Sequence, residues 1–357
     1  MREAGKREEG KREGQEQEQE RNTGVLRSAQ NDGHFRVATG QNDGHFQHGL
    51  WLAARRLLVT LPVLWLVVTV VFLLIHLVPG DPIVQMLGEG ATAADVSALR
   101  HAYGFDAPLP VQYERYMGGV VRGDLGQSLR LRDSVTHLVA QRYPYTLALA
   151  LAALGLGTLA AVPAGVWAAT HRDRWLDRTI GVVSLVGLSF PNFALGPLLI
   201  LAFSIGLGWL PVSGSGSGWG FFTHLILPAV TLGSGLAAVL TRMVRTAMLE
   251  ELGQDYIRTA RAKGLSERAV VYRHALRNAL IPVLTVIGLQ FGSLLAGAIV
   301  TETIFSLPGI GRLTLSAISN RDYALVQGCI LAIGLTYVGV NLLTDLAYVG
   351  VNPRMRG

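Results

Sequence analysis

The stretch DYIRTARAKGLSERAVVYRHALRNALIP, residues 255–282, decides how this chain is interpreted. It contains six Arg or Lys residues and a single glycine, Gly264. Glu250, Glu251 and Asp255 come early and Arg258, Arg261 and Lys263 late before that glycine, which is the charge order that stabilises a helix. Glycine at a helix end, with Ser266 soon after it, is typical of one helix stopping and another starting. The stretch therefore predicts a helix, a tight glycine turn and a second helix.

The second helix is expected to follow an apolar stripe at helical spacing, formed by Ala269, Tyr272, Leu276 and Leu280. The two helices together would form a rigid basic projection, whose shape favours docking to a protein partner. A simpler alternative stays open, because a basic loop also fixes membrane topology and touches anionic headgroups through its charge alone.

Outside this stretch the chain is largely apolar. Half of its 357 residues are hydrophobic and 16% are charged, a balance that favours membrane spans over one water-surrounded core. A helix needs about 20 apolar residues to cross a bilayer, and backbone groups in hydrocarbon must be satisfied within the helix. The sequence predicts an all-α polytopic membrane protein with six transmembrane helices, near Leu57–Val78, Tyr145–Ala169, Ile180–Leu207, Leu225–Leu240, Leu280–Val300 and Ala324–Val349.

The placement of Arg and Lys predicts the orientation of these spans, because short basic loops stay in the cytoplasm. Basic residues precede the first span, fill HRDRWLDR at 171–178, crowd the loop 246–279 and end the chain. Both termini and the loop 246–279 are therefore expected to be cytoplasmic. Residues 80–143 carry six Arg and seven acids; this long segment is expected to be extracytoplasmic, since long segments cross regardless of charge.

Residues 1–49 do not fit this scheme. They contain no apolar run, and the hexapeptide QNDGHF occurs twice, at 30–35 and 41–46. Polar sequence of this kind predicts a disordered extension without a role in transport. The functional start is expected near Leu50.

Several kinds of chemistry are missing from the sequence. It has no G-x-x-x-x-G-K-[ST] phosphate loop, and its single cysteine, Cys329, has no partner for an intramolecular disulfide. No serine or histidine pattern suggests an intramembrane protease, and His76 is expected to be a hydrogen-bonded residue at the membrane interface. We therefore expect no enzyme, no cofactor, no bound metal and no nucleic-acid partner.

The segment YIRTARAKGLSERAVVYRHALRNALIPVLT, residues 256–285, resembles the cytoplasmic loop of permease subunits of binding-protein-dependent ABC importers. The glycine of that pattern corresponds to Gly264 and its two alanines to Thr259 and Ala260, while Arg258 stands where glutamate is usual. The run ARAKG at 260–264 resembles the dipeptide and oligopeptide branch.

Other segments resemble the same branch in the same order. From about Leu50 to the end these are HLVPGDPI (76–83), YGFDAPLPVQY (103–113), GDLGQS (123–128), ETIFSLPGIGRL (302–313), NRDYALVQG (320–328) and the tail DLAYVGVNPRMRG (345–357). The tail differs in having Asn352 where aspartate is usual.

The resemblance implies the type I permease fold of ABC importers for residues 50–357. It implies a second similar permease subunit, two cytoplasmic ABC ATPases and an extracytoplasmic substrate-binding protein as partners. The expected cargo is a di- or oligopeptide, with nickel or glutathione-like solutes as alternatives. A stand-alone secondary carrier is the alternative from another class. The residues implied to contact the ATPase are Arg258, Thr259, Ala260, Arg261, Ala262, Lys263 and Gly264.

One apolar run also contains a candidate pathway residue. In SLVGLSFPNFALGPLL, residues 184–199, Pro191 and Pro197 predict a kinked span. Asn192 lies beside the first proline, and polar side chains at membrane depth usually face the bundle interior or a cavity. Asn192 is therefore predicted to line the pathway.

The predicted topology can be tested with a reporter that is active only in the cytoplasm. Fusions after Arg174 or Ser266 should be active, and fusions after Ala107 or Ser215 inactive, because basic loops are retained inside. Activity is measured per unit of fusion protein in membranes. An active fusion at Ala107 would overturn the six-span arrangement.

Overall fold

The computed structural model describes residues 58–77, 82–87, 90–102, 104–128 and 130–351. All of them belong to one compact unit, Leu57–Val351. The disordered extension predicted for residues 1–49, the tail after Val351 and the ends of the first predicted span lie outside the described residues.

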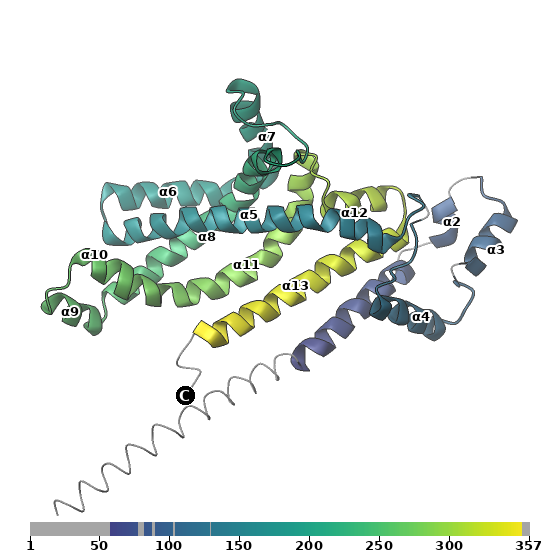
Figure 1. The fold of residues 1–357 in the computed structure, drawn as a ribbon, viewed down its shortest axis with the longest axis horizontal. Coiled ribbons are helices and arrows are strands. Elements are labelled where there is room, and N and C mark those ends of the chain that lie inside the picture. The colour runs from purple at the N-terminus through teal and green to yellow at the C-terminus, as the bar shows by residue number, and fades with distance from the viewer. Residues whose placement is uncertain (1–57, 78–81, 88–89, 103, 129, 352–357) are drawn as a thin grey trace, which may run out of the picture. The chain divides into compact units, whose positions relative to one another are not determined.

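The described part of the chain is helical apart from turns and one isolated bridge between Gln127 and Ser134, which confirms the all-α fold (Figure 1). The elements, in chain order, are a first helix Leu58–Leu77, α2 Pro82–Leu87, α3 Ala93–Ala102, α4 Leu109–Arg122, α5 Val135–Thr170, α6 Trp175–Ser189, α7 Asn192–Leu199, the π-helical turn η1 Ile200–Gly206, α8 Gly220–Leu252, α9 Asp255–Ala262, α10 Glu267–Ala269, the π-helical turn η2 Val270–Ala275, α11 Leu276–Ile304, α12 Ile310–Ser319 and α13 Tyr323–Val351.

Five helices are long and apolar enough to cross a membrane, and a bent helix pair is the sixth candidate. The pair is α6 with α7–η1, which meet at an angle of 105°. Pro191 causes the break, because its ring fixes φ at −67° and it has no N–H to continue the helix, while Phe190 before it is extended. The span predicted over Ile180–Leu207 is therefore two helices rather than one kinked helix.

Glycines allow α5 and α8 to pack closely along their length. A Cβ at Gly233 would lie 2.6 Å from the carbonyl oxygen of Ala153, and one at Gly165 would lie 2.6 Å from the Cβ of Val244. Contacts advance along both helices together, so α5 and α8 run in the same direction. In lipid, where apolar burial gives little driving force, such close backbone contact is a main source of helix association.

The helices α10–η2–α11 and α13 complete the bundle. Gly288 and Gly292 of α11 face Thr344 and Tyr337 of α13, and a Cβ at either glycine would lie 2.1 Å from a side-chain atom of α13. The largest buried cluster draws on α5, α8, α9, η2 and α11.

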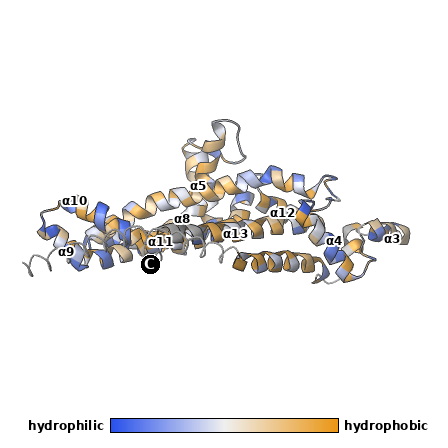
Figure 2. Ribbon diagram, turned by 60° about the horizontal axis from the view of Figure 1, so that its bottom comes forward, coloured by the Kyte–Doolittle hydropathy of each residue, from blue (hydrophilic) through white to orange (hydrophobic). Residues whose placement is uncertain are grey.

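Hydrophilic residues gather at the two ends of this bundle. Figure 2 shows orange colour along the long helices and blue colour around α9–α10 and around α3–α4. Large apolar side chains stay exposed between these ends, such as Val182, Val183 and Leu185 of α6 at 61%, 64% and 56%. A water-soluble protein seldom exposes so continuous an apolar face, and a membrane span does so as a rule.

The α5–α8 contact can be tested by adding side chains to α5. Gly165→Val should destabilise the folded protein by about 1–3 kcal/mol, because the new methyl groups overlap Val244 and the carbonyl of Thr241. Thermal unfolding of the protein in detergent measures this. Gly155→Val is the matched control, since a Cβ at Gly155 meets no atom within 4 Å. Equal effects of the two variants would contradict the packing described here.

Candidate functional site

The basic stretch forms a helix, a sharp turn and a second helix at one end of the bundle, as predicted. We call α9, the turn at Lys263–Ser266 and α10 the corner. Gln254 is extended and starts α9, which ends at Ala262. Gly264 has a φ of +78°, in the left-handed region that glycine tolerates. The Leu265 N–H then returns to the Ala260 carbonyl at 3.3 Å, closing the turn.

Ser266 starts the next helix, and its Oγ accepts from the Ala269 N–H at 3.4 Å. Across the turn, Arg261 binds Glu267 through two nitrogens, with Nε–Oε1 at 2.6 Å and Nη2–Oε2 at 3.3 Å. A bidentate guanidinium–carboxylate pair of this kind restricts the relative orientation of the two helices. The corner is thus a shaped element, not a slack connection.

The inner side of the corner has its own apolar contacts. Ile257 and Ala260 of α9 are buried in the same cluster as Val270 and Val271 of η2. These contacts join the corner to the bundle core.

Tyr256 attaches the corner to the two long helices beside it. Its hydroxyl donates to the Glu251 carboxylate near the end of α8 and accepts from Asn278 Nδ2 of α11 at 3.1 Å. Partial burial, followed by the hydrogen bond to Glu251, raises the pKa of Tyr256 above its usual value. The phenol therefore stays protonated at neutral pH and keeps both contacts.

Six of the seven predicted contact residues are exposed on the corner, and Ala260 is buried at 8% exposure. Ala260 therefore supports the corner from inside. The exposed set presents three cations, Arg258, Arg261 and Lys263, of which Arg261 is engaged with Glu267 and Arg258 lies 3.5 Å from Asp255.

The predicted apolar stripe is partly wrong. Tyr272 is 50% exposed, and the residues buried along this turn are Val270, Val271 and Ala275. The cause is the π-helical turn η2, which uses i→i+5 hydrogen bonds and rotates the following residues away from the α-helical spacing.

A second polar site lies at the other end of α11. Glu302 is fully buried, and its Oε1 accepts from Thr146 Oγ1 of α5 at 2.5 Å. Its Oε2 accepts from the backbone N–H of Arg312 at 2.9 Å, and the Gly311 N–H is a further donor. Thr146 Oγ1 in turn accepts from the Ile310 N–H at 2.8 Å. The carboxylate thus satisfies the free N–H groups at the start of α12.

This site explains the spacing of ETIFSLPGIGRL. A Cβ at Gly309 would lie 2.1 Å from Glu302 Oε1, and one at Gly311 would lie 2.9 Å from Oε2 and 2.6 Å from Ile299 Cα. Only glycine leaves room for the carboxylate at both positions. We call this set, Thr146, Glu302 and the backbone of residues 309–312, the Glu302 cluster.

Two more of the segments that resemble the permease family, GDLGQS and NRDYALVQG, also contact each other. Asp322, from NRDYALVQG, accepts from Ser128 Oγ of GDLGQS at 2.5 Å. Its Oδ1 accepts from the Leu325 N–H at 3.3 Å, as a cap of α13. A side chain of residues 123–128 is thereby tied to the start of α13.

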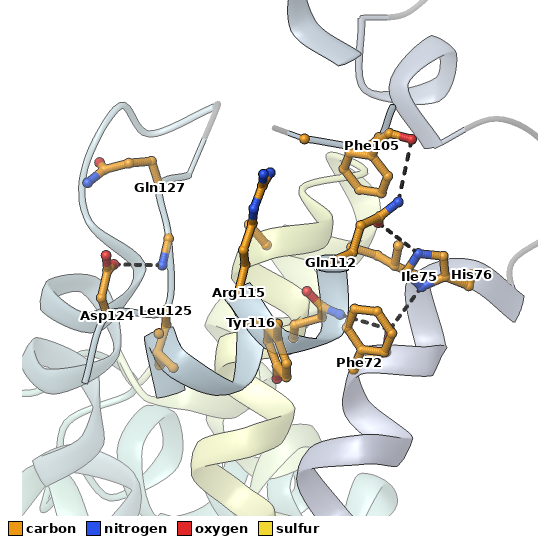
Figure 3. Close-up of a pocket in the computed structure, with 15 residues that line it drawn as sticks. Phe72, Ile75, His76, Phe105, Gln112, Arg115, Tyr116, Asp124, Leu125 and Gln127 are labelled. Carbon is orange, nitrogen blue, oxygen red and sulfur yellow. Dashed lines mark hydrogen bonds between the residues drawn. The ribbon is translucent and has the colours of Figure 1, made fainter. Parts of the chain in front are cut away.

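Residues of α4 and of the loops before and after it line a pocket of about 280 Å³ against the first helix and α13 (Figure 3). Phe72, Tyr116 and Arg115 are among the residues that line it. His76 is hydrogen-bonded to the Phe72 carbonyl and to Gln112, each at 3.2 Å, as expected for an interfacial histidine. Burial raises the pKa of Tyr116 to about 12.

Asn192 begins α7 directly after the break at Pro191 and is half-buried. Its Nδ2 lies 3.9 Å from the position that a Cβ on Gly297 of α11 would occupy. The side chain therefore lies between α7 and α11, and its role in a pathway stays a prediction.

Two family models match this chain. Residues 161–357 match the binding-protein-dependent transport system inner membrane component, and residues 50–150 match the N-terminal part of the same kind of component. The chain belongs to this family. It is therefore a multi-pass protein of the inner membrane and the permease component of an ABC importer.

Similar proteins agree with this assignment. The chain is 44% identical to a glutathione transport system permease protein, GsiC, of Escherichia coli O6:H1, over 85% of this chain and 97% of the relative. It is 43% identical, with the same coverage, to the GsiC proteins of Salmonella paratyphi A and Escherichia coli K12. A crystal form of the MetNI methionine ABC transporter has the same fold, with a TM-score of 0.51 and 21% identity over 60% of this chain and 96% of the matched chain.

Sequence reasoning missed Glu302 and Thr146 as candidate residues. The signal was present in the sequence as a glutamate at the end of an apolar run, followed by two glycines separated by one residue. It was not recognised because the partner Thr146 lies 156 positions away.

The corner predicts a specific effect of substituting Gly264. A Cβ there meets no atom within 4 Å, so the only penalty is the left-handed backbone, about 1–2 kcal/mol and largest for a residue branched at Cβ. Gly264→Val should insert normally but misdirect the corner, giving weak ATPase association and little ATP-driven import. Gly264→Ala should be milder.

The measurement is ATPase co-purification and uptake into vesicles, both normalised to permease abundance. Gly253→Ala is the matched control, because Gly253 lies in the same loop with an ordinary φ of −82°. Parent-like transport by Gly264→Val would show that the loop serves only as a topological anchor.

Proposed function

We propose that this chain forms the translocation pathway for small peptides, glutathione included, together with a second, similar permease subunit. ATP is hydrolysed by two separate cytoplasmic ABC ATPases, and an extracytoplasmic binding protein delivers the solute. Both chain termini and the corner α9–α10 face the cytoplasm.

The corner is the single observation that carries the ATPase contact. It combines a left-handed glycine, an ion pair across the turn and a buried inner side, so its shape is retained when a partner pushes on it. Arg258 and Lys263 are exposed on it, and exposed cations strengthen association with an acidic surface. Residues Arg258–Gly264 are therefore the proposed contact with the ATPase.

The peptide class of the cargo is supported by the curated relatives, which are named as glutathione transport permeases and match nearly their whole length. Glutathione is itself a short peptide with free carboxylates and an ammonium group. A pathway suited to it would accept other small peptides of similar charge and length, while the binding protein would select among them.

The outer segment α3–α4 is the proposed seat of the binding protein. Its helices are well formed, since Thr92 and Asp95 make a reciprocal cap at the start of α3, with 3.2 Å and 3.0 Å hydrogen bonds. Gln112 ties the segment to His76 of the first helix. A docked protein would thus press on an ordered surface connected to the spans.

The proposal is tested by purifying the complex through a tag on this chain and reconstituting it in vesicles. The complex should take up labelled glutathione, or a labelled dipeptide, only with ATP and binding protein present. The isolated chain should neither bind nor hydrolyse ATP, because it has no phosphate loop.

Each outcome separates the alternatives. Uptake of nickel but not of either peptide would overturn the proposed cargo. Solute uptake by the isolated chain without ATP would identify a secondary carrier, and saturable ATP binding to that chain would contradict the division of labour between subunits.

A further inference from the structure

We propose that Glu302 is a positioning residue that transmits movement of the cytoplasmic corner to the outer ends of α5 and α12. This inference rests on the proposed function, because it assumes that a partner moves the corner. The residue has no contact with the corner itself, so its role depends on the helix that connects the two sites.

That connection is one continuous helical run, with the π-helical turn η2 and Pro282 inside it. Residues Glu267–Ile304 run for 38 residues through α10, η2 and α11, about 57 Å at 1.5 Å per residue. The corner is bonded to the inner end of this helix by Arg261–Glu267 and by Tyr256–Asn278. No loop or extended residue separates the corner from Ile304, so we expect a push on the corner to move α11 as well.

The outer end of the same helix carries the Glu302 cluster. Glu302 has 0% exposure, the lowest of any charged side chain in the described part of the chain. Its oxygens are bonded to Thr146 of α5 and to the backbone of Arg312 in α12. Three elements, α5, α11 and α12, therefore meet at one carboxylate.

The chemistry of the cluster makes a carboxylate necessary at this point. Thr146 Oγ1 already accepts from the Ile310 N–H, so its proton is directed at Glu302. The groups facing Glu302 are thus all donors, and an ionised carboxylate is an acceptor at both oxygens. Glutamine has the same size but turns one acceptor into a donor, which leaves a buried donor unpaired.

The outer end of α11 also contacts the broken span. A Cβ on Gly196 of α7 would lie 3.2 Å from Ile304 and 3.3 Å from Phe305, and the Phe305 carbonyl accepts from the Gly214 N–H at 2.9 Å. Phe305 follows Glu302 by less than one helical turn. The Glu302 cluster therefore sets how α5 and α12 lie relative to this end of α11. The same end of α11 contacts α7, whose first residue is Asn192.

The experiment compares variants of the complete importer, purified through a tag on this chain and reconstituted with its binding protein. Glu302→Gln turns one acceptor of the cluster into a donor, and Thr146→Val removes the hydroxyl that bonds both Glu302 and the Ile310 N–H. Neither substitution changes side-chain size much. The expected result is about a tenfold fall in glutathione transported per ATP hydrolysed, the scale of one lost buried hydrogen bond. ATPase co-purification and basal ATP hydrolysis should stay within about twofold of the parent, because the corner is untouched.

Two variants serve as matched controls. Thr146→Ser keeps the hydroxyl group and should restore the parental ratio. Thr301→Val removes a hydroxyl from an equally buried threonine beside Glu302. That hydroxyl donates to the Gly297 carbonyl within α11 at 3.3 Å, so this variant should behave like the parent.

Either of two results would overturn the inference. If Glu302→Gln transports glutathione at the parental ratio, the cluster transmits nothing. If ATPase association and basal hydrolysis fall together with uptake, Glu302 only maintains the fold. Failure of the proposed function is distinguishable from both, because the parent complex itself would then show no ATP-driven uptake of glutathione.

Discussion

Long helices in a membrane approach each other closely only where side chains are small, and this constraint organises the molecule. Gly165 and Gly233 let α5 and α8 lie with backbones nearly in contact, and the largest buried cluster forms around them. Because lipid tails are as apolar as leucine, dispersion contacts of this kind hold the helices together better than apolar burial does. The apolar faces that remain on α6 stay exposed without cost in lipid.

The buried polar groups have a second role, which is to join elements that the apolar core does not join. Glu302 and Asp322 each satisfy donors from a segment far away in the sequence. At the other end, Arg245 of α8 binds Asp177 of α6 through two bonds of 2.6 and 2.7 Å. A fully buried charge such as Glu302 would cost several kcal/mol if it were left unpaired, so its pairing specifies one arrangement of its elements.

These two kinds of contact suit a component that moves as a unit. The corner is held by an ion pair and an inner apolar side, and one continuous helix extends from it to the Glu302 cluster. The break at Pro191 is different, because Phe190 and Pro191 are extended and end α6 there, whereas α11 stays helical through Pro282. Stiff and bendable elements thus lie side by side in the same bundle.

The sequence by itself determined the features that depend on neighbouring residues. Apolar runs long enough for a bilayer predicted the spans, and Gly264 with Ser266 predicted the turn and the new helix, because caps are local hydrogen bonds within one helical turn. The family segments were recognisable because each is a short run of consecutive residues and they follow one another in the expected order. The position of Asp255–Lys263 relative to a partner does not follow from such local signals.

The tertiary structure decided the rest. The angle of 105° after Phe190 depends on what α7 packs against, and the exposure of Tyr272 depends on a π-helical turn that propensities do not signal. The Glu302 cluster joins residues 156 positions apart. Such contacts arise only when packing brings distant helices together, since no residue within a turn of Glu302 specifies Thr146 as its partner.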